Sequence, residues 1–274
     1  MPEYDFSGQV ALITGAGHGQ GRSHAVTYAE NGADVVVTDI AADQADIAYE
    51  LSTSDELEET ASLVEAEGQE ALPLVMDVTK EDDIERAVKE AVDHFGRIDF
   101  LANNAGVLDS SPLVELEQER WDTVLDTNMK GMWLCSKHVG RHFIERGEGG
   151  KIVSTLSNGA FRGSPGQAGH YGASKWGIRG LTKTLAVELG EYDVNVNAVA
   201  PGGVMTPMTR GMMEEFGEEL YERMQELTGS ATLIHPDQMV EPRDVSEAYM
   251  WLSSEAARYV TGAVIKVDQG DTVV

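Results

Sequence analysis

The sequence predicts an α/β fold in which a parallel sheet of seven strands is covered by helices on both faces. Three observations support this prediction: short β-branched runs alternate with longer amphipathic stretches, the runs are separated by helix-length segments, and no repeat or Pro/Ser-rich linker interrupts them. Such alternation is typical of βαβ units. We therefore expect a single domain over residues 1–274.

The elements follow one another in the order that βαβ units require. Seven β-branched runs have the length of buried strands, at residues 10–14, 35–38, 72–76, 100–103, 151–155, 194–199 and 264–267. Six segments place apolar residues at helical spacing, at residues 23–30, 55–67, 84–94, 121–145, 171–189 and 246–253.

Two segments are longer than this alternation needs. Residues 40–54 lengthen the connection after the second strand, and residues 205–238 form a Met-rich, helical excursion before the last helix. Long connections in compact domains are often lids or binding loops. Residues 205–238 are interpreted as a substrate lid and residues 40–54 as an insertion near a ligand site, with surface decoration as the alternative for both.

Charge and composition exclude several functions. The chain has 20 basic and 47 acidic residues, a net charge of −27, and therefore repels nucleic acid and anionic membranes. The uncharged stretches 6–21 and 194–209 are broken by Gly, Asn, Thr or Pro, and no signal peptide is recognised. Cys135 is the only cysteine, so no intrachain disulfide is possible. We expect a cytoplasmic protein with no nucleic-acid or membrane partner.

The acidic residues are spread along the chain rather than gathered in a tail. High salt screens the repulsion on such a surface, because the Debye length falls to about 3 Å at 1 M. A halophilic host and an ordinary acidic protein both remain open interpretations.

A glycine cluster directly follows the first predicted strand. It reads Thr14-Gly15-Ala16-Gly17-His18-Gly19-Gln20-Gly21 and opens the next helix, where free N–H groups and the helix dipole can hold a pyrophosphate. Asp39 ends the second strand, 18 residues after Gly21, where a carboxylate accepts hydrogen bonds from the adenosine ribose and repels a 2′-phosphate. The pattern predicts a Rossmann fold that binds NAD rather than NADP.

Tyr171 and Lys175 lie four residues apart, on one face of a predicted helix. A nearby cation stabilises phenolate, so Lys175 is expected to lower the pKa of Tyr171 from its usual value of about 10 and make it an acid/base group. Alone, such a pair is more often an accident of the surface.

Taken together, the motifs resemble those of the short-chain dehydrogenase/reductase family over essentially all of the chain. They occur in the family's order and spacing: Thr14-Gly15-x-x-x-Gly19-x-Gly21, Asn103-Asn104-Ala105-Gly106, Asn128, Ser157, Tyr171-x-x-x-Lys175 and Pro201-Gly202. The resemblance implies an enzyme that transfers a hydride between a secondary alcohol and NAD, giving a ketone.

The resemblance also implies roles for single residues. Tyr171 is the general acid/base, Lys175 holds the nicotinamide ribose, Ser157 hydrogen-bonds the substrate oxygen, and Asn128 anchors a water that links Lys175 to solvent. Ser154 is an alternative to Ser157, although its spacing to Tyr171 fits less well.

The cofactor contacts carried over from the family are matches of position. Asp77 and Val78 match residues at the adenine, and Val204 and Thr206 match residues at the carboxamide. The full expected set is Gly15, His18, Gly19, Gln20, Gly21, Asp39, Ile40, Asp77, Val78, Asn104, Ala105, Gly106, Tyr171, Lys175, Val204 and Thr206. No spacing of histidines indicates a metal site, so none is predicted.

Within the family, residues 19–25 and the insertion 40–54 resemble the carveol dehydrogenase-like enzymes, including those associated with the redox peptide mycofactocin. That resemblance implies an insertion that covers the bound NAD, and an external redox carrier that reoxidises it. An apolar flap of Ile47, Tyr49 and Leu51 is consistent with slow NAD release.

The substrate is expected to be hydrophobic and terpenoid-like, because methionines form adaptable apolar walls. Six of them lie in or beside the excursion: Met205, Met208, Met212, Met213, Met224 and Met239. Ordinary lid packing would explain them as well. The candidate pocket residues are Leu108, Asn158, Phe161, Trp176 and Met208. A sugar or polyol dehydrogenase, a 3-oxoacyl reductase and a non-catalytic NAD-binding protein are the alternatives.

The family's usual pairing surface is formed by the helices at residues 129–145 and 171–189. These carry more apolar residues than one sheet face should bury, which favours an isologous interface. The residues concerned are Trp133, Leu134, Cys135, Val139, Phe143, Trp176, Ile178, Leu181 and Leu185. A homotetramer is expected from the resemblance alone.

Overall fold

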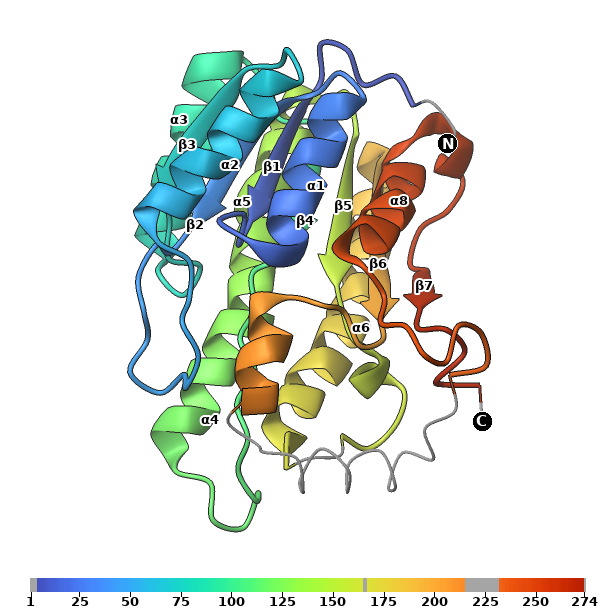
Figure 1. The fold of residues 1–274 in the computed structure, drawn as a ribbon. Coiled ribbons are helices and arrows are strands. Elements are labelled where there is room, and N and C mark those ends of the chain that lie inside the picture. Colours follow the sequence, from blue (N-terminus) through green and yellow to red (C-terminus); the bar gives the residue numbers. More distant parts are fainter. Residues whose placement is uncertain (1–3, 165–166, 215–231, 274) are drawn as a thin grey trace.

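The structure is a computed structural model that describes residues 4–164, 167–214 and 232–273. Within these residues, seven parallel strands form one sheet in the order β3-β2-β1-β4-β5-β6-β7, with helices on both sides (Figure 1). The strands are β1 (Val10–Thr14), β2 (Asp34–Asp39), β3 (Ala71–Val75), β4 (Phe100–Asn103), β5 (Gly150–Thr155), β6 (Val194–Pro201) and β7 (Val264–Val267). The predicted fold class is confirmed.

The two faces of the sheet are covered by different helices. One core cluster joins Leu12 and its neighbours to α3 (Glu81–Phe95), α5 (Gly131–Arg146) and α6 (Gly169–Leu189). The other joins Ile13 and its neighbours to α1 (Gly19–Glu30), α2 (Ser54–Ala66) and α8 (Pro242–Ser253). Since Leu12 and Ile13 are adjacent in β1, the alternation of side chains along a strand feeds both cores.

The strand order reverses beside β1, which pairs with both β2 and β4. Ile13 lies opposite Val37 on one side and Ala102 on the other. In open parallel sheets such a reversal leaves a crevice at the carboxyl ends of the strands. No helix in the described part of the chain is long and apolar enough to cross a membrane.

The helix predicted over residues 121–145 is wrong in one respect, because a π-helical turn interrupts it. The segment comprises α4 (Gln118–Leu125), the π turn η1 (Asp126–Lys130) and α5. Inside η1, the Asn128 side chain accepts the Val107 N–H at 2.8 Å and donates to the Val107 carbonyl at 2.9 Å. A π turn widens the helix locally and is common at functional sites. Apolar spacing alone does not reveal it.

Short 3₁₀ turns complete the described elements. They are η2 (Asn158–Ala160), η3 (Gly190–Tyr192) and η4 (Glu255–Ala257). Residues 207–214 are helical, and this short helix lies below the sheet in Figure 1.

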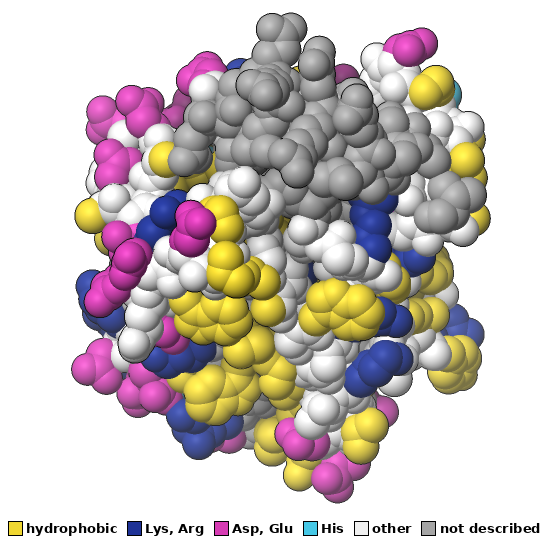
Figure 2. Space-filling model, turned by 90° about the horizontal axis from the view of Figure 1, so that it is seen from below, with side chains coloured by type: hydrophobic (Ala, Val, Ile, Leu, Met, Phe, Trp, Pro, Cys, Tyr) yellow, Lys and Arg dark blue, Asp and Glu magenta, His cyan; other side chains and the backbone are white. Residues whose placement is uncertain are grey.

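The apolar surplus expected on the pairing helices is smaller than predicted. Six of the counted side chains are buried in the chain's own core: Leu134, Cys135, Val139, Phe143, Ile178 and Leu185. Trp133 and Trp176 remain 42% and 47% exposed. Seen from below, hydrophobic side chains gather in the middle of the molecule, with charged ones around them (Figure 2).

Candidate active site

One cavity of about 480 Å³ opens at the carboxyl ends of the strands and contains most of the predicted site residues. Loops that follow β1 to β6 all contribute to its wall. The predicted residues that line it are Gly15, His18, Gly19, Gln20, Asp39, Ile40, Asp77, Val78, Asn104, Ala105, Gly106, Ser157, Tyr171, Lys175, Val204 and Thr206. Gly21 and Asn128 are not in this lining.

Glycine is required in the turn after β1 for reasons that the structure makes visible. Gly15 has a φ of +67°, and a Cβ there would lie 2.8 Å from the Ala105 Cα. A Cβ on Gly21 would lie 2.0 Å from the Gly15 carbonyl oxygen. Gly21 therefore does not line the cavity; the absence of its side chain lets the Gly15 carbonyl pack closely against the start of the helix. The Asn104 amide also donates to the carbonyls of Thr14 and Gly15, at 3.1 and 3.0 Å.

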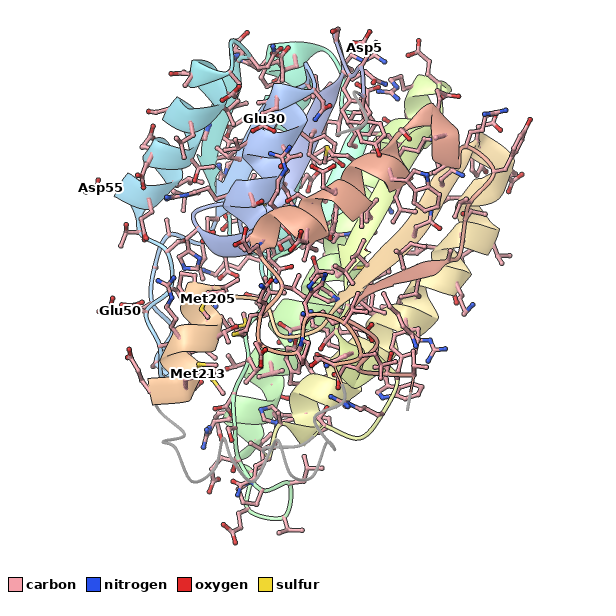
Figure 3. All side chains as sticks on the ribbon, turned by 45° about the vertical axis from the view of Figure 1, so that its right-hand side comes forward. Asp5, Glu30, Glu50, Asp55, Met205 and Met213 are labelled. Atoms are coloured by element: carbon pink, nitrogen blue, oxygen red, sulfur yellow. The ribbon has the colours of Figure 1, made fainter. Side chains whose placement is uncertain are left out.

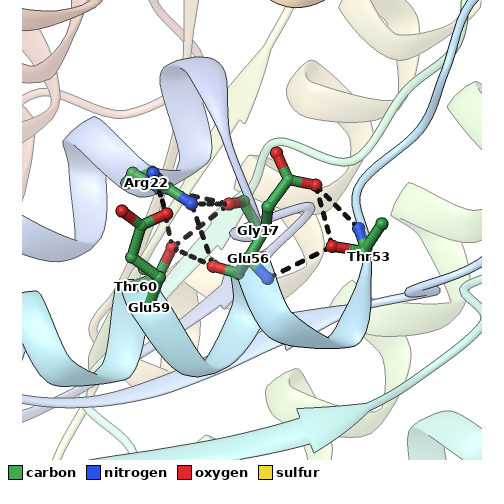
Figure 4. Close-up of polar contacts among 6 residues, drawn as sticks. All are labelled: Gly17, Arg22, Thr53, Glu56, Glu59 and Thr60. Atoms are coloured by element: carbon green, nitrogen blue, oxygen red, sulfur yellow. Dashed lines mark hydrogen bonds and ion pairs between the residues drawn. The ribbon is translucent and has the colours of Figure 1, made fainter.

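Arg22 ties the glycine turn to α2 (Figure 4). Its guanidinium donates twice to the Gly17 carbonyl, at 3.1 and 2.7 Å, and also to the Glu56 carbonyl and the Thr60 hydroxyl. An ion pair with Glu59 at 2.8 Å completes the contacts. Residue spacing did not predict this clamp, which holds the turn against the helix that follows the 40–54 insertion.

Asp39 is buried at the edge of the cavity. One carboxylate oxygen accepts the Gly17 N–H at 2.9 Å, and the other accepts the Ala41 N–H at 3.2 Å. These bonds fix the carboxylate beside the glycine turn. A negative charge there disfavours a ligand that carries a phosphate at this end of the cavity.

Several buried polar atoms in the cavity wall have no hydrogen-bond partner among the described residues. They are His18 Nε2, Gln20 Oε1, Ser52 Oγ and Thr127 Oγ1. Because buried polar groups are normally paired, these atoms fit a polar ligand that hydrogen-bonds along the wall. Together with the glycine cradle, they are compatible with a dinucleotide.

Lys175 lies on α6 with its ammonium inside the cavity wall. Its Nζ donates to the Thr155 carbonyl at 2.9 Å and lies 5.4 Å from the centre of the Tyr171 ring. Burial lowers the pKa of Lys175 to about 8, because taking the ammonium out of water disfavours its charged form. The predicted pair thus lies on one face of one helix.

The electrostatics of Tyr171 differ from the expectation. Burial raises the pKa of Tyr171 above its usual value, and a hydrogen bond with Ser157 opposes this rise. The net shift is opposite to the expected lowering, so the prediction was wrong in its direction. The physical reason is that desolvation of the phenolate outweighs the other contributions.

The structure separates the two candidate serines. Ser157 lies in the cavity wall and shares a hydrogen bond with the Tyr171 phenol. Ser154 is buried within β5, and its hydroxyl accepts from the Asn103 amide at 3.4 Å. Only Ser157 is therefore in contact with Tyr171 and the cavity.

The methionine wall is formed in part. Met208, Met212, Met213 and Met239 line the cavity. Met205 is 38% exposed and outside its lining, and Met224 lies outside the described residues. Figure 3 shows Met205 and Met213 near the two ends of the short helix at 207–214.

The insertion 40–54 is packed firmly against its neighbours. Tyr49 is 8% exposed and its hydroxyl accepts the Leu108 N–H at 3.0 Å. A Cβ on Gly211 would lie 2.3 Å from the Tyr49 Cβ, so insertion and short helix touch. Ile47, Tyr49 and Met212 share one apolar cluster, against which Tyr171 packs.

Two predicted pocket residues lie elsewhere. Phe161 packs under the Arg179 and Lys266 cations, at 4.3 and 4.2 Å from its ring centre, and Trp176 is exposed beside Arg179. Neither lines the cavity, because Phe161 packs against the core cluster that contains Ile178 and Trp176 faces outward. Leu108, Asn158 and Met208 do line it.

Other wall residues were not predicted. They include Gln44, Ser52, Thr127, Thr155, Arg162 and Asp271. Asp271 lies far along the chain, and no local pattern distinguishes it. Among residues 4–164, 167–214 and 232–273, no three His, Cys, Asp or Glu side chains are grouped to hold a metal ion.

Comparisons with known proteins agree with this geometry. The family model described as enoyl-(acyl carrier protein) reductase matches residues 15–272. The chain is 41% identical over 273 residues to (-)-trans-carveol dehydrogenase of Rhodococcus erythropolis, covering 97% of this chain and 98% of that protein. It is 37% identical to a 3-oxoacyl-[acyl-carrier-protein] reductase of Thermotoga maritima, covering 96% and 97%.

A solved structure gives the same result. The carveol dehydrogenase of Mycobacterium avium, in complex with NAD, superposes with a TM-score of 0.89 at 36% identity and covers 98% of this chain and 99% of its own. The chain belongs to the short-chain dehydrogenase/reductase family. The predicted likeness to carveol dehydrogenases is confirmed.

Proposed function

We propose that the protein is an NAD-dependent oxidoreductase that interconverts a secondary alcohol and its ketone. The observation that supports this most is that Ser157, Tyr171 and Lys175 line the same cavity as the glycine turn and Asp39. When bound, NAD accepts or returns the hydride. A carveol dehydrogenase and an NAD complex among the relatives support the same chemistry.

The chain's own residues divide the remaining work. Tyr171 exchanges a proton with the substrate oxygen, and Ser157, already hydrogen-bonded to that phenol, stabilises charge on the same oxygen. Burial disfavours the charged form of Lys175, so a ligand hydroxyl that accepts a hydrogen bond from the ammonium stabilises that form. Asn128, held by Val107 and by the Ser174 hydroxyl at 3.1 Å, is proposed to anchor the water behind Lys175.

The remaining cofactor residues are proposed from their place in the wall. Asp39 binds the adenosine ribose, Asp77 and Val78 contact the adenine, and Val204 and Thr206 hold the carboxamide. The Asp39 carboxylate repels a 2′-phosphate, which favours NAD over NADP and makes an NADPH-dependent 3-oxoacyl reductase the weaker candidate.

The proposed substrate is a hydrophobic, terpenoid-like secondary alcohol, because the lid, residues 205–238, contributes Met208, Met212 and Met213 to the cavity. A panel of terpenoid alcohols, sugars, polyols and steroids, each tested with NAD and with an artificial electron acceptor, is the direct test. Turnover of sugars alone would favour the polyol dehydrogenase. No turnover of any alcohol or ketone, with NAD bound, would favour a non-catalytic NAD-binding protein.

The insertion 40–54 is proposed to slow the exchange of NAD, and an external carrier of the mycofactocin type would then reoxidise it. Tyr49, buried against residues 207–214 and bonded to Leu108, supports this idea. Mass spectrometry of the purified protein should detect retained NAD, and Tyr49→Phe should release it faster than the control Glu50→Gln, whose side chain is exposed (Figure 3). A protein that emerges empty and turns over freely with added NAD would contradict the proposal.

We also propose a cytoplasmic homotetramer, in which the exposed Trp133 and Trp176 contribute to the pairing surface. The acidic surface is proposed to reflect a halophilic host. Light scattering tests the assembly. Melting at low and molar KCl tests the salt dependence, since an ordinary acidic protein should be equally stable in both.

A further inference from the structure

The end of the cavity beside Ser157 carries a small polar cluster, formed by Asn158, Arg162 and Asp271. All three side chains line the cavity. Arg162 donates to both Asp271 carboxylate oxygens, at 2.9 and 2.6 Å, and the Asn158 amide nitrogen donates to the same carboxylate. The Asn158 side-chain oxygen lies 3.0 Å from the Ser157 hydroxyl oxygen. The proposed reaction of one alcohol oxygen makes no use of this cluster.

The charges of the cluster indicate what kind of group it can bind. The Arg162 and Asp271 side chains are 25% and 12% exposed, so both are partly open to the cavity. A ligand carboxylate there would be repelled by Asp271, and a ligand ammonium would be repelled by Arg162. A neutral polar group is therefore the ligand that fits the pair.

The ion pair also has hydrogen-bonding capacity that the described residues do not use. Arg162 has five N–H protons, of which three go to the Asp271 carboxylate and backbone carbonyl, and its Nε–H has no partner among those residues. A carboxylate has about four acceptor positions, and the bonds from Arg162 and Asn158 occupy three of those on Asp271. A hydroxyl is the neutral group that can donate to Asp271 and accept from Arg162, whereas a ketone oxygen only accepts.

The opposite side of the pocket is apolar. Met208 and Tyr171 both pack against the cluster that contains Met212, so methionines lie beside the phenol. One amide group and two hydrogen bonds connect Ser157 to Asp271, a span of roughly 8 Å at most. A single ring with a short substituent bridges such a distance.

We propose that Arg162 and Asp271 form a subsite for a second hydroxyl group of the substrate, which is thus an apolar secondary alcohol with a further hydroxyl on or beside its ring. The proposal rests on the proposed alcohol–ketone function. The hydrocarbon part of such a substrate packs against the methionines, and its second hydroxyl reaches the ion pair. An alcohol with one oxygen would instead place hydrocarbon against these charged groups, which is unfavourable.

Carveol and sobrerol are matched probes for this subsite, because sobrerol is carveol hydrated at its isopropenyl group. The added hydroxyl is on a tertiary carbon, so only the same ring alcohol can be oxidised in both. With the wild-type protein and NAD, we expect kcat/KM to be at least about tenfold higher for sobrerol in the preferred stereoisomer. A smaller ratio for every stereoisomer would overturn the proposal.

The double variant Arg162→Met with Asp271→Leu removes both charges together, so that neither is left unpaired. The ratio of kcat/KM for sobrerol to that for carveol should fall to about one or below. A purely structural role of the ion pair would lower kcat/KM equally for both probes, and an unchanged ratio would refute the subsite. If the double variant does not fold, Asp271→Asn must still lower the ratio, and the same refutation applies.

Asp268→Asn is the matched control on the same segment. Asp268 accepts the N–H groups of Gly270 and Thr272, at 3.0 and 3.2 Å, and does not line the cavity. This variant should keep the wild-type ratio. An equal fall of the ratio in Asp268→Asn would show that disturbance of the segment, and not loss of the subsite, is the cause.

Turnover of the probes separates failure of this proposal from failure of the proposed function. If carveol is oxidised without preference for sobrerol, only the subsite is wrong. If neither probe is oxidised while another alcohol of the panel is, the subsite is again wrong and the function stands. If no alcohol is oxidised, the proposed function is wrong, and the subsite falls with it.

Discussion

Replacing Arg22 with methionine should loosen the glycine turn and lower the stability of the protein. The change removes the two bonds to the Gly17 carbonyl and those to Glu56 and Thr60, while it keeps an apolar stem of similar length. The Thr60 hydroxyl lies 3.2 Å from the Gly17 carbonyl and 3.0 Å from the Glu56 carbonyl, so it can donate its one proton to either oxygen.

The expected loss is about 3 kcal/mol in the free energy of unfolding, because hydrogen bonds from a charged donor contribute about 1.5–3 kcal/mol each and these share acceptors. For a chain of this size, that corresponds to a fall in Tm of roughly 6–12 °C. Affinity for NAD should fall as well, since the turn that is proposed to hold its pyrophosphate is less restrained.

Urea unfolding followed by circular dichroism measures the loss, and Glu59→Gln is the control. Glu59 is 59% exposed in its pair with Arg22, so the control should cost less than about 1 kcal/mol. The reasoning is refuted if Arg22→Met and Glu59→Gln unfold at the same urea concentration.

Three further outcomes follow from the site. Below about pH 8 the folded and the unfolded chain both keep the Lys175 proton, and between about pH 8 and 10.5 only the unfolded chain keeps it. Without NAD, the free energy of unfolding of the wild-type protein should therefore rise with pH over this range, by up to about 3 kcal/mol relative to Lys175→Met. A flat difference would contradict the burial of this ammonium. Asp39→Asn should lower the preference for NAD over NADP at least about tenfold in kcat/KM, and an unchanged ratio would remove Asp39 from cofactor choice. Gly15→Ala should abolish NAD binding, measured by calorimetry, because its Cβ would meet the Ala105 backbone at 2.8 Å; wild-type affinity would show that the turn is not the binding site.

The parts of the fold and site that sequence predicts well are those encoded by local patterns. Val10–Thr14 and the glycines after it carry local signals for a strand and a turn, and the spacing of Tyr171 and Lys175 fixes their common helix face. The position of Asp39 at the end of β2 follows from the same regularity.

Features that depend on distant contacts were not predictable in this way. Arg22 follows the glycine motif, but its role depends on where α2 packs. Asp271 meets Arg162 only because the chain end returns to the cavity. Phe161 was misplaced because its flanking cations, Arg179 and Lys266, come from other elements. The pKa of Tyr171 depends on burial, which spacing does not report.

Tyr171 is proposed to exchange the proton in an NAD-dependent reaction of an alcohol. Tyr171→Phe removes only the phenolic oxygen, and the glycine turn, Asp39 and Lys175 remain to bind NAD. Steady-state turnover of the best alcohol from the panel, measured beside NAD binding to the same preparation, tests the claim directly. We expect unchanged NAD affinity, with turnover reduced by at least about 10²-fold. Turnover close to that of the wild-type protein would contradict it.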